Sequence, residues 1–142
     1  MCFLGVDIGG TSVRSLVTDA GGKILGYQRI ARVSHESLWQ AINDCLGTVL
    51  AQSSVVHVEA AVVGAAGAGP TGNHDVCQSV EKAFRAVGLD VTPQVVTDIE
   101  IAYWSAAVLG DGSILVAGTG AIAGRFSEWR CVDRRDGAGW LL

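Results

Sequence analysis

The first part of the chain alternates short apolar runs with turn-forming residues. Runs at residues 2–8, 12–19 and 23–30 are rich in apolar and β-branched side chains, and Gly9-Gly10 and Gly21-Gly22 lie between them. Short apolar runs joined by glycine-containing turns are typical of β-hairpins. The pattern therefore predicts an antiparallel meander of three strands at the start of the chain.

A helical period follows the meander. Apolar residues recur at helical spacing between Leu38 and Val49, which is typical of a helix that packs one face against a core. A serine, Ser34 or Ser37, is placed to cap this helix. The helix is expected to run to about Gln52.

The remaining elements alternate between strand and helix. We expect a buried strand at 58–63, a loop at 64–75, a helix at 76–87 that Gly88 ends, a strand at 95–97, a helix after Asp98, two antiparallel strands around residues 118–120 and a third strand at 129–132. The helix after Asp98 is expected to present one face formed by Ile101, Ala102, Ser105, Ala106 and Leu109. Strands mixed with crossover helices predict an α/β fold whose ligands bind at strand ends. No linker or repeat array divides the chain, so one domain is expected.

Composition limits the classes of function. The chain has 142 residues, 49% of them hydrophobic, and a net charge of −4. A net negative charge argues against nonspecific binding to nucleic acid or to an anionic membrane surface. Free thiols are expected rather than a metal site, because no Cys-x-x-Cys pair or nearby histidine accompanies Cys2, Cys45, Cys77 and Cys131. No apolar run approaches the roughly 18 residues of a membrane span, and a cytoplasmic location is expected.

The stretch from Val6 to Thr11 carries the first candidate chemistry. It places Asp7 and two glycines, Gly9 and Gly10, between two predicted strands. Glycine lets backbone N–H groups point into a turn and lets an anion approach closely. Asp7 is then placed to hold a hydrated Mg²⁺, while the Thr11 hydroxyl and the turn amides face the terminal phosphate of a nucleotide. A plain hairpin turn is the alternative interpretation of the same residues.

The same plan recurs near the end of the chain. Gly118-Thr119-Gly120 lies between the apolar runs 114–117 and 121–126, so a second phosphate-sized turn is expected. Between the two turns, the predicted strand at 95–97 is followed by the carboxylate of Asp98 at the start of a helix. A metal-binding acid, two anion-binding turns and a second acid are the groups that phosphoryl transfer requires.

These motifs resemble those of the sugar kinase/actin/heat-shock chaperone ATPase superfamily, and within it the BadF/BadG/BcrA/BcrD-type ATPases, which include N-acetylglucosamine kinase. Residues 7–11 resemble the first phosphate motif of the family, Thr97-Asp98 the segment with the catalytic acid, and residues 118–120 the second phosphate motif. Residues 137–142 are similar to the run that leads into Gly-Asp-Glu-Gly-Ser in these kinases. The resemblance spans the whole chain.

The resemblance implies a ribonuclease H-like (actin-like ATPase) lobe, with a mixed five-stranded sheet and flanking helices. It implies ATP-dependent phosphorylation of an amino sugar, N-acetylglucosamine or glucosamine, with ATP and Mg²⁺ as cofactors. By this resemblance Asp7 places Mg²⁺, Asp98 is the catalytic residue that orients the attacking hydroxyl, and the phosphates are surrounded by Gly9, Gly10, Thr11, Gly118, Thr119 and Gly120.

Family members have two such lobes, with ATP in the cleft between them. Residues 1–142 are therefore expected to be the N-terminal lobe, with the C-terminal lobe absent from this chain and the isolated chain inactive. The expected partners are the amino sugar and ATP, with no nucleic acid and no membrane. A homodimer stays open.

Two other functions stay open. One is an ATPase activator of an acyl-CoA dehydratase or reductase, although such activators typically supply cluster-binding cysteines and the spacing here offers none. The other is a catalytically inactive nucleotide-binding interaction module, which departures from the family pattern favour. Ser12 stands where many relatives have Lys, and Ala121 stands where a Ser often follows Gly-Thr-Gly. Residues 30–35 also lack the Asn-bearing loop with which sugar-binding relatives often hold the hexose.

Asp98 has a structural interpretation as well. Thr97 and Glu100 fit a capping box around it, and a negative charge in the first turn of a helix favours the helix dipole. The two roles are compatible, because a carboxylate fixed at a helix start can also orient a sugar hydroxyl and accept its proton late in the reaction.

Overall fold

The chain divides into two compact units. The computed structural model describes residues 1–32, 37–65, 68, 74–117 and 121–136. The units are Met1–Asp98 and Ile99–Leu142, which differs from the single domain expected from length and composition. The division follows from hydrogen bonding, because the described strands form two separate sheets, one in each unit.

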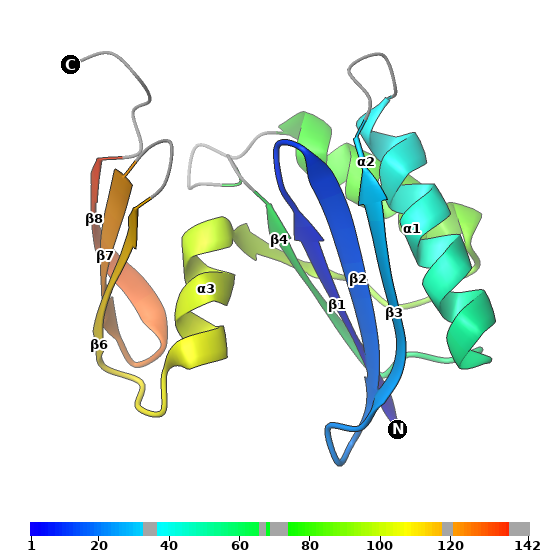
Figure 1. Ribbon diagram of the computed structural model, residues 1–142, viewed down its shortest axis with the longest axis horizontal. Coiled ribbons are helices and arrows are strands. Elements are labelled where there is room, and N and C mark those ends of the chain that lie inside the picture. The colour runs from blue at the N-terminus through cyan, green and yellow to red at the C-terminus, as the bar shows by residue number, and fades with distance from the viewer. Residues whose placement is uncertain (33–36, 66–67, 69–73, 118–120, 137–142) are drawn as a thin grey trace. The chain divides into compact units, whose positions relative to one another are not determined.

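The first unit is built on a five-stranded sheet with the order β3-β2-β1-β4-β5. Its strands are Cys2–Ile8 (β1), Ser12–Asp19 (β2), Ile24–Ala31 (β3), Ala60–Ala65 (β4) and Gln94–Thr97 (β5). β1, β2 and β3 form the predicted antiparallel meander, whereas β4 pairs in parallel with β1 and β5 in parallel with β4 (Figure 1). The prediction of an α/β fold with a mixed five-stranded sheet is confirmed.

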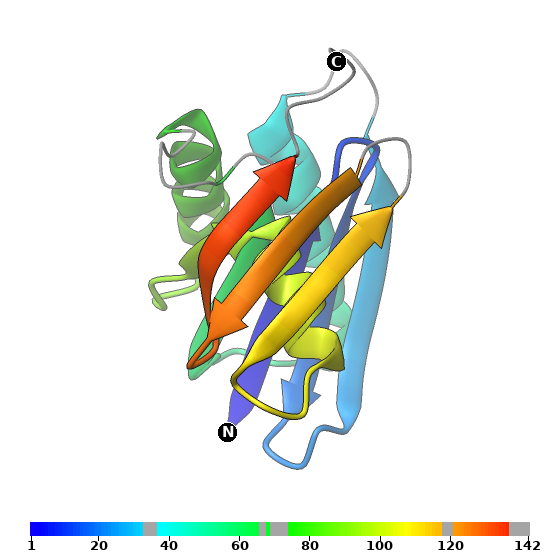
Figure 2. The ribbon, with the colours of Figure 1, turned by 90° about the vertical axis from the view of Figure 1, so that its left-hand side faces the viewer.

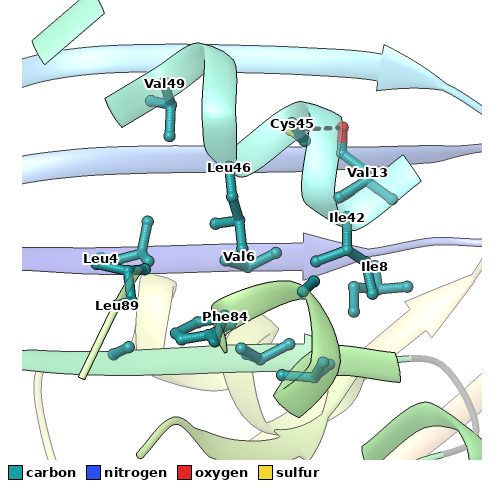
Figure 3. Close-up of a cluster of buried hydrophobic side chains, with 14 of the residues drawn as sticks. Leu4, Val6, Ile8, Val13, Ile42, Cys45, Leu46, Val49, Phe84 and Leu89 are labelled. Atoms are coloured by element: carbon teal, nitrogen blue, oxygen red, sulfur yellow. Dashed lines mark hydrogen bonds between the residues drawn. The ribbon is translucent and has the colours of Figure 1, made fainter. Parts of the chain in front are cut away.

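Two helices, α1 (Leu38–Ser53) and α2 (His74–Ala86), cover one face of this sheet (Figure 1). Because side chains alternate along a strand, the even-numbered residues of β1 share that face and are buried: Leu4, Val6 and Ile8. They form one core with apolar side chains of the helices, among them Ile42, Leu46, Val49 and Phe84 (Figure 3). Asp7 therefore belongs to the opposite face of β1.

The start of α1 is close to the prediction. The helix begins at Leu38, directly after Ser37, and ends at Ser53. The Ser37 hydroxyl donates to Oε1 of Gln40 at 2.6 Å, and its side chain makes no capping hydrogen bond to the backbone. The other candidate cap, Ser34, lies outside the described residues.

The loop predicted at 64–75 is shorter at both ends than expected. Gly64 and Ala65 look like loop residues in the sequence, but both are buried in β4, where pairing with β1 and β5 holds them. At the other end, His74 and Asp75 belong to the first turn of α2 instead of to a turn before it. Gly88 follows α2 with a φ of +76°, in agreement with the predicted helix end.

The second unit combines one helix with a three-stranded antiparallel sheet, β6-β7-β8 (Figure 2). The helix α3 spans Asp98–Ala106, so its first residue is the last residue of the first unit. The strands are Gly112–Ala117 (β6), Ala121–Ser127 (β7) and Arg130–Asp136 (β8). The predicted hairpin on either side of residues 118–120 is confirmed, and the third strand extends four residues beyond the prediction of 129–132.

The face that α3 buries differs from the prediction. Its buried residues are Ile99 and Tyr103, and the Tyr103 ring stacks on Phe126 of β7 with centroids 3.9 Å apart. The predicted face of Ile101, Ala102, Ser105, Ala106 and Leu109 is therefore wrong, and Leu109 follows the helix and is 72% exposed. Apolar side chains occur all around this short helix, so their spacing cannot indicate which side meets a sheet.

Candidate functional site

The residues Gly9, Gly10 and Thr11 form a tight hairpin turn. The N–H of Gly9 donates to the carbonyl oxygen of Ser12 at 2.9 Å, directly beyond the last paired residues of β1 and β2, Ile8 and Val13. Gly10 and Thr11 are exposed at the tip of the turn. β2 begins at Ser12, so a strand follows the glycines, as the sequence predicted, and not the helix that a P-loop would place there.

Nothing in the described part of the chain requires glycine at position 10. A Cβ atom added at Gly10 would meet no atom within 4 Å. The described glycines with positive φ are Gly22 and Gly88, so the φ of Gly10 does not itself demand glycine. A glycine at this open position lets another molecule come close to the backbone, although a plain hairpin turn also accommodates it.

Asp7 lies beside this turn and pairs with a residue that the sequence analysis did not single out. Oδ2 of Asp7 accepts a hydrogen bond from Nη1 of Arg14 at 2.8 Å, and the two side chains are 35% and 47% exposed. The two residues are cross-strand partners. The position of the turn determines this pairing. With Gly10 and Thr11 at the tip, Asp7 and Arg14 are each three residues from the tip along the chain and so lie opposite each other.

The described residues offer one carboxylate for a metal ion at this position. Among them no three His, Cys, Asp or Glu side chains come together as a metal-binding group. Mg²⁺ is usually bound through one or two carboxylates, several water molecules and the phosphate oxygens of a substrate. A single, partly exposed Asp7 fits that mode of binding, and it does not fit a site made of protein ligands alone.

The strand register brings Asp98 to the same edge of the sheet as Asp7. Asp7 is level with Gly64 of β4, which is level with Val96 of β5, and Asp98 follows that strand directly. The carboxyl ends of β1, β4 and β5 share one edge because the three strands are parallel. With β4 between them, β1 and β5 are about 10 Å apart. Two acids therefore flank one edge of the first sheet.

The position of Asp98 agrees with both interpretations of that residue. β5 ends at Thr97 and α3 begins at Asp98 with no residue between them. A carboxylate in the first turn stabilises the positive end of the helix dipole. The same carboxylate lies at the strand end, where α/β proteins bind their ligands.

Arg32 is a second residue that the sequence analysis did not single out. Its Nη1 donates to the carbonyl oxygen of Gly9 at 3.1 Å, and its backbone N–H donates to the carbonyl oxygen of Thr11 at 2.9 Å. Arg32 comes directly after β3, whose register places Ala31 opposite Ser12. The pairing of the third strand is thus the feature that could have indicated this contact.

The second candidate turn belongs to the other unit. β6 ends at Ala117 and β7 begins at Ala121, and these two residues are partners in the ladder. Gly118, Thr119 and Gly120 themselves lie outside the described residues, as do residues 137–142. No helix in the described part of the chain is long and apolar enough to cross a membrane.

Comparisons with known proteins identify the fold. No protein-family model matches the sequence, and no curated protein matches it either. Among solved structures, a provisionally named N-acetylglucosamine kinase from Porphyromonas gingivalis matches with 18% identity and a TM-score of 0.76, over 99% of this chain and 50% of its own. A similarly named protein from Chromobacterium violaceum matches with 21% identity and a TM-score of 0.66, over the same shares of the two chains.

A ROK family glucokinase from Streptomyces griseus, solved in complex with glucose and AMPPNP, also matches. It has 23% identity and a TM-score of 0.63, over 92% of this chain and 46% of its own. At these identities the likeness shows the fold alone: the chain shares the actin-like ATPase fold of sugar kinase structures. It spans about half the length of the solved structures it matches.

Proposed function

We propose that this chain provides one half of the active site of an ATP-dependent sugar kinase, with an amino sugar, N-acetylglucosamine or glucosamine, as the acceptor. The observation that carries the proposal is the register of the first sheet, in which the Asp7 hairpin and Asp98 share one edge. The similar fold of the Streptomyces griseus glucokinase, which was solved with glucose and AMPPNP, supports ATP and a sugar as ligands. The two provisionally named N-acetylglucosamine kinases support an amino sugar.

In this proposal residues 1–98 are the N-terminal lobe, and the second unit begins another lobe. Both units contain a three-stranded antiparallel meander whose first two strands are joined at a glycine-containing segment, residues 9–11 in one and 118–120 in the other. The half-length coverage of the similar structures agrees with a second lobe that this chain does not complete. The alternative is the expectation from the sequence, in which residues 1–142 together form the N-terminal lobe.

The proposed reaction follows from the residues at the edge of the first sheet. Asp98 accepts a hydrogen bond from the sugar hydroxyl and takes its proton late, as the hydroxyl oxygen bonds to the terminal phosphorus and the bond to the ADP oxygen breaks. The amides and the Thr11 hydroxyl of the turn hold phosphate oxygens. Gly118, Thr119 and Gly120 are proposed to add the second set of phosphate contacts. Asp7 would hold Mg²⁺, which supplies positive charge to the phosphates when it is bound.

The test is a sugar-phosphorylation assay with ATP, Mg²⁺ and each amino sugar, run on the 142-residue chain and on a longer protein that contains it. The chain alone is expected to show little turnover, because a half-open cleft leaves the reacting groups in water. In the longer protein, Asp98→Asn is expected to lower kcat by about 10² to 10⁴, the range for loss of a general base. Nucleotide affinity should change little.

The matched control is Asp90→Asn. Asp90 is an exposed residue before β5, at the other end of that strand from Asp98, so its substitution should leave kcat unchanged. If Asp98 only stabilises the helix, Asp98→Asn should cost about 0.3 to 1 kcal/mol of stability and leave turnover intact. A folded Asp98→Asn enzyme with the wild-type kcat would contradict the proposed role. Nucleotide binding without turnover in every form of the protein would favour an interaction module.

A further inference from the structure

Three charged side chains align across the meander beside the Gly9–Thr11 turn. Asp7 of β1 is level with Arg14 of β2, and Arg14 is level with Arg29 of β3. Arg14 and Arg29 are exposed. By strand alternation the row lies on the face of the sheet that α1 and α2 leave uncovered. Arg32, one residue beyond β3, reaches the turn itself.

This row carries more positive charge than its own carboxylate can balance. Arg14 forms an ion pair with Asp7, whereas no carboxylate among the described residues is recorded within 4 Å of Arg29 or Arg32. Like charges at directly opposite positions of two strands destabilise a sheet. Arg14 and Arg29 occupy such positions in a chain whose net charge is −4. The excess of cations is therefore a local feature that folding alone does not favour.

Arg32 places a positive charge at the turn, which the uncharged Ser12 does not supply. Arg32 is half-buried and its Nη1 donates to the Gly9 carbonyl, and a guanidinium has five N–H donors in total. The hydrogen bond from its backbone N–H to Thr11 fixes where the side chain starts. Ser12 is 4% exposed and uncharged, so it does not provide a cation for an anion at the tip of the turn.

We propose that Arg29 and Arg32 bind the phosphate chain of the phosphoryl donor. This inference rests on the proposed function and adds residues that recognise the donor. Guanidinium groups suit the task, because they bind phosphate oxygens through paired, charge-assisted hydrogen bonds. The ligand chemistry is a chain of linked phosphates, so an inorganic triphosphate without a nucleoside should bind to the same residues.

The experiment measures binding of inorganic tripolyphosphate to the 142-residue chain by calorimetry, without added metal. Wild-type protein should bind, and binding should weaken as salt concentration rises. Arg29→Gln and Arg32→Gln should each weaken binding about 10- to 100-fold, because a charge-assisted hydrogen bond is about twice as strong as a neutral one. Lys23→Gln is the matched control, since it removes one positive charge at the exposed turn at the far end of β2 and β3.

The outcomes separate this inference from the proposed function. If wild-type protein does not bind tripolyphosphate, this inference fails, while the proposed function is still decided by the phosphorylation assay on the longer protein. If it binds, and Arg29→Gln and Arg32→Gln bind as tightly as Lys23→Gln, the arginines are not donor contacts while the turn remains one. The melting temperature of Arg32→Gln shows whether its effect on binding is structural. Glutamine still has an N–H for the Gly9 carbonyl, so the variant can keep that hydrogen bond. If Arg32→Gln melts at a lower temperature than wild type, the tripolyphosphate affinity of the variant at the exposed Arg29, Arg29→Gln, decides whether the inference holds. Arg32→Lys should then recover part of the affinity for tripolyphosphate.

Discussion

A side chain added at Gly10 of the first hairpin would meet no described atom within 4 Å, whereas one added at Gly124 of the second sheet would lie 2.8 Å from Cδ1 of Ile99. Gly112, at the start of the same sheet, is equally restricted, since its added Cβ would lie 2.7 Å from the Tyr103 hydroxyl oxygen. The second sheet uses glycines to let α3 approach. The glycine at the tip of the first hairpin has no comparable packing contact.

The two meanders also differ in how their faces are covered. β1 and β2 have buried residues under α1 and α2, including Val6 and Val13 at 4% and 0% exposure (Figure 3). β6 is mostly exposed along its length, and Leu115 is 69% exposed. The hydrophobic effect therefore stabilises the first hairpin through a two-helix layer, whereas the second depends on one short helix. Similar strand patterns in a sequence can thus build units of unequal stability.

The largest expected effect comes from removing one aromatic side chain from each unit. Phe84 of α2 and Phe126 of β7 are each 2% exposed. Phe84→Ala and Phe126→Ala should each destabilise their own unit by about 3 to 5 kcal/mol, through lost burial and the cavity left behind. Native-state hydrogen exchange measures this, because it reports stability segment by segment.

The comparison predicts a different exchange pattern for each variant. Phe84→Ala should lower amide protection in β1 to β5, and Phe126→Ala should lower it in β6 to β8 and α3. Equal loss of protection across both units, from either substitution, would show that the chain unfolds as one cooperative body.

A smaller effect is expected at Gly124. The added methyl group of Gly124→Ala would press against Ile99, which is 1% exposed, and against the Phe126 ring. Overpacking of this kind costs about 1 to 3 kcal/mol, measured as a shift of the urea midpoint. Gly5→Ala in β1 is the matched control, because an added Cβ there meets nothing within 4 Å. A Gly124→Ala protein as stable as Gly5→Ala would mean that α3 does not pack closely on β7.

The sequence predicted the parts of this fold that local patterns determine. The strands at 2–8 and 12–19 were placed to the residue, because apolar runs bounded by glycines specify a hairpin locally. The buried face of α3 depends on which sheet the helix packs against, and the extent of β4 depends on which strands it pairs with. The spacing of apolar residues in the sequence does not determine either. In the candidate site, Asp7 and Asp98 could be selected by residue type. Arg14 and Arg32 required the register of three strands.

The stability of the first unit should depend on pH through a buried thiol in its core. Burial raises the pKa of the Cys45 thiol, an effect that its hydrogen bond with the Ser15 side chain partly offsets. Because the pKa is higher in the folded than in the unfolded state, the thiol contributes stability that is present below the unfolded pKa and is lost as pH rises through the folded value. When the pH rises from about 7 to about 10, a range that spans the usual cysteine pKa, the urea midpoint should fall more in wild type than in Cys45→Ala. Equal falls in both proteins would exclude this contribution.

The claim that the first turn is a phosphate site is tested most directly at Gly10. Gly10→Ala should melt at the wild-type temperature or slightly above it, because an added Cβ there meets no described atom within 4 Å and alanine lowers the entropy of the unfolded chain, which stabilises a protein by about 0.4 to 1 kcal/mol. The same methyl group should keep a phosphate from the turn and weaken tripolyphosphate binding about tenfold or more, the equivalent of roughly 1.4 kcal/mol. Gly5→Ala should change neither quantity by a comparable amount. If Gly10→Ala binds tripolyphosphate with wild-type affinity, the turn is a plain hairpin and the proposed site is wrong.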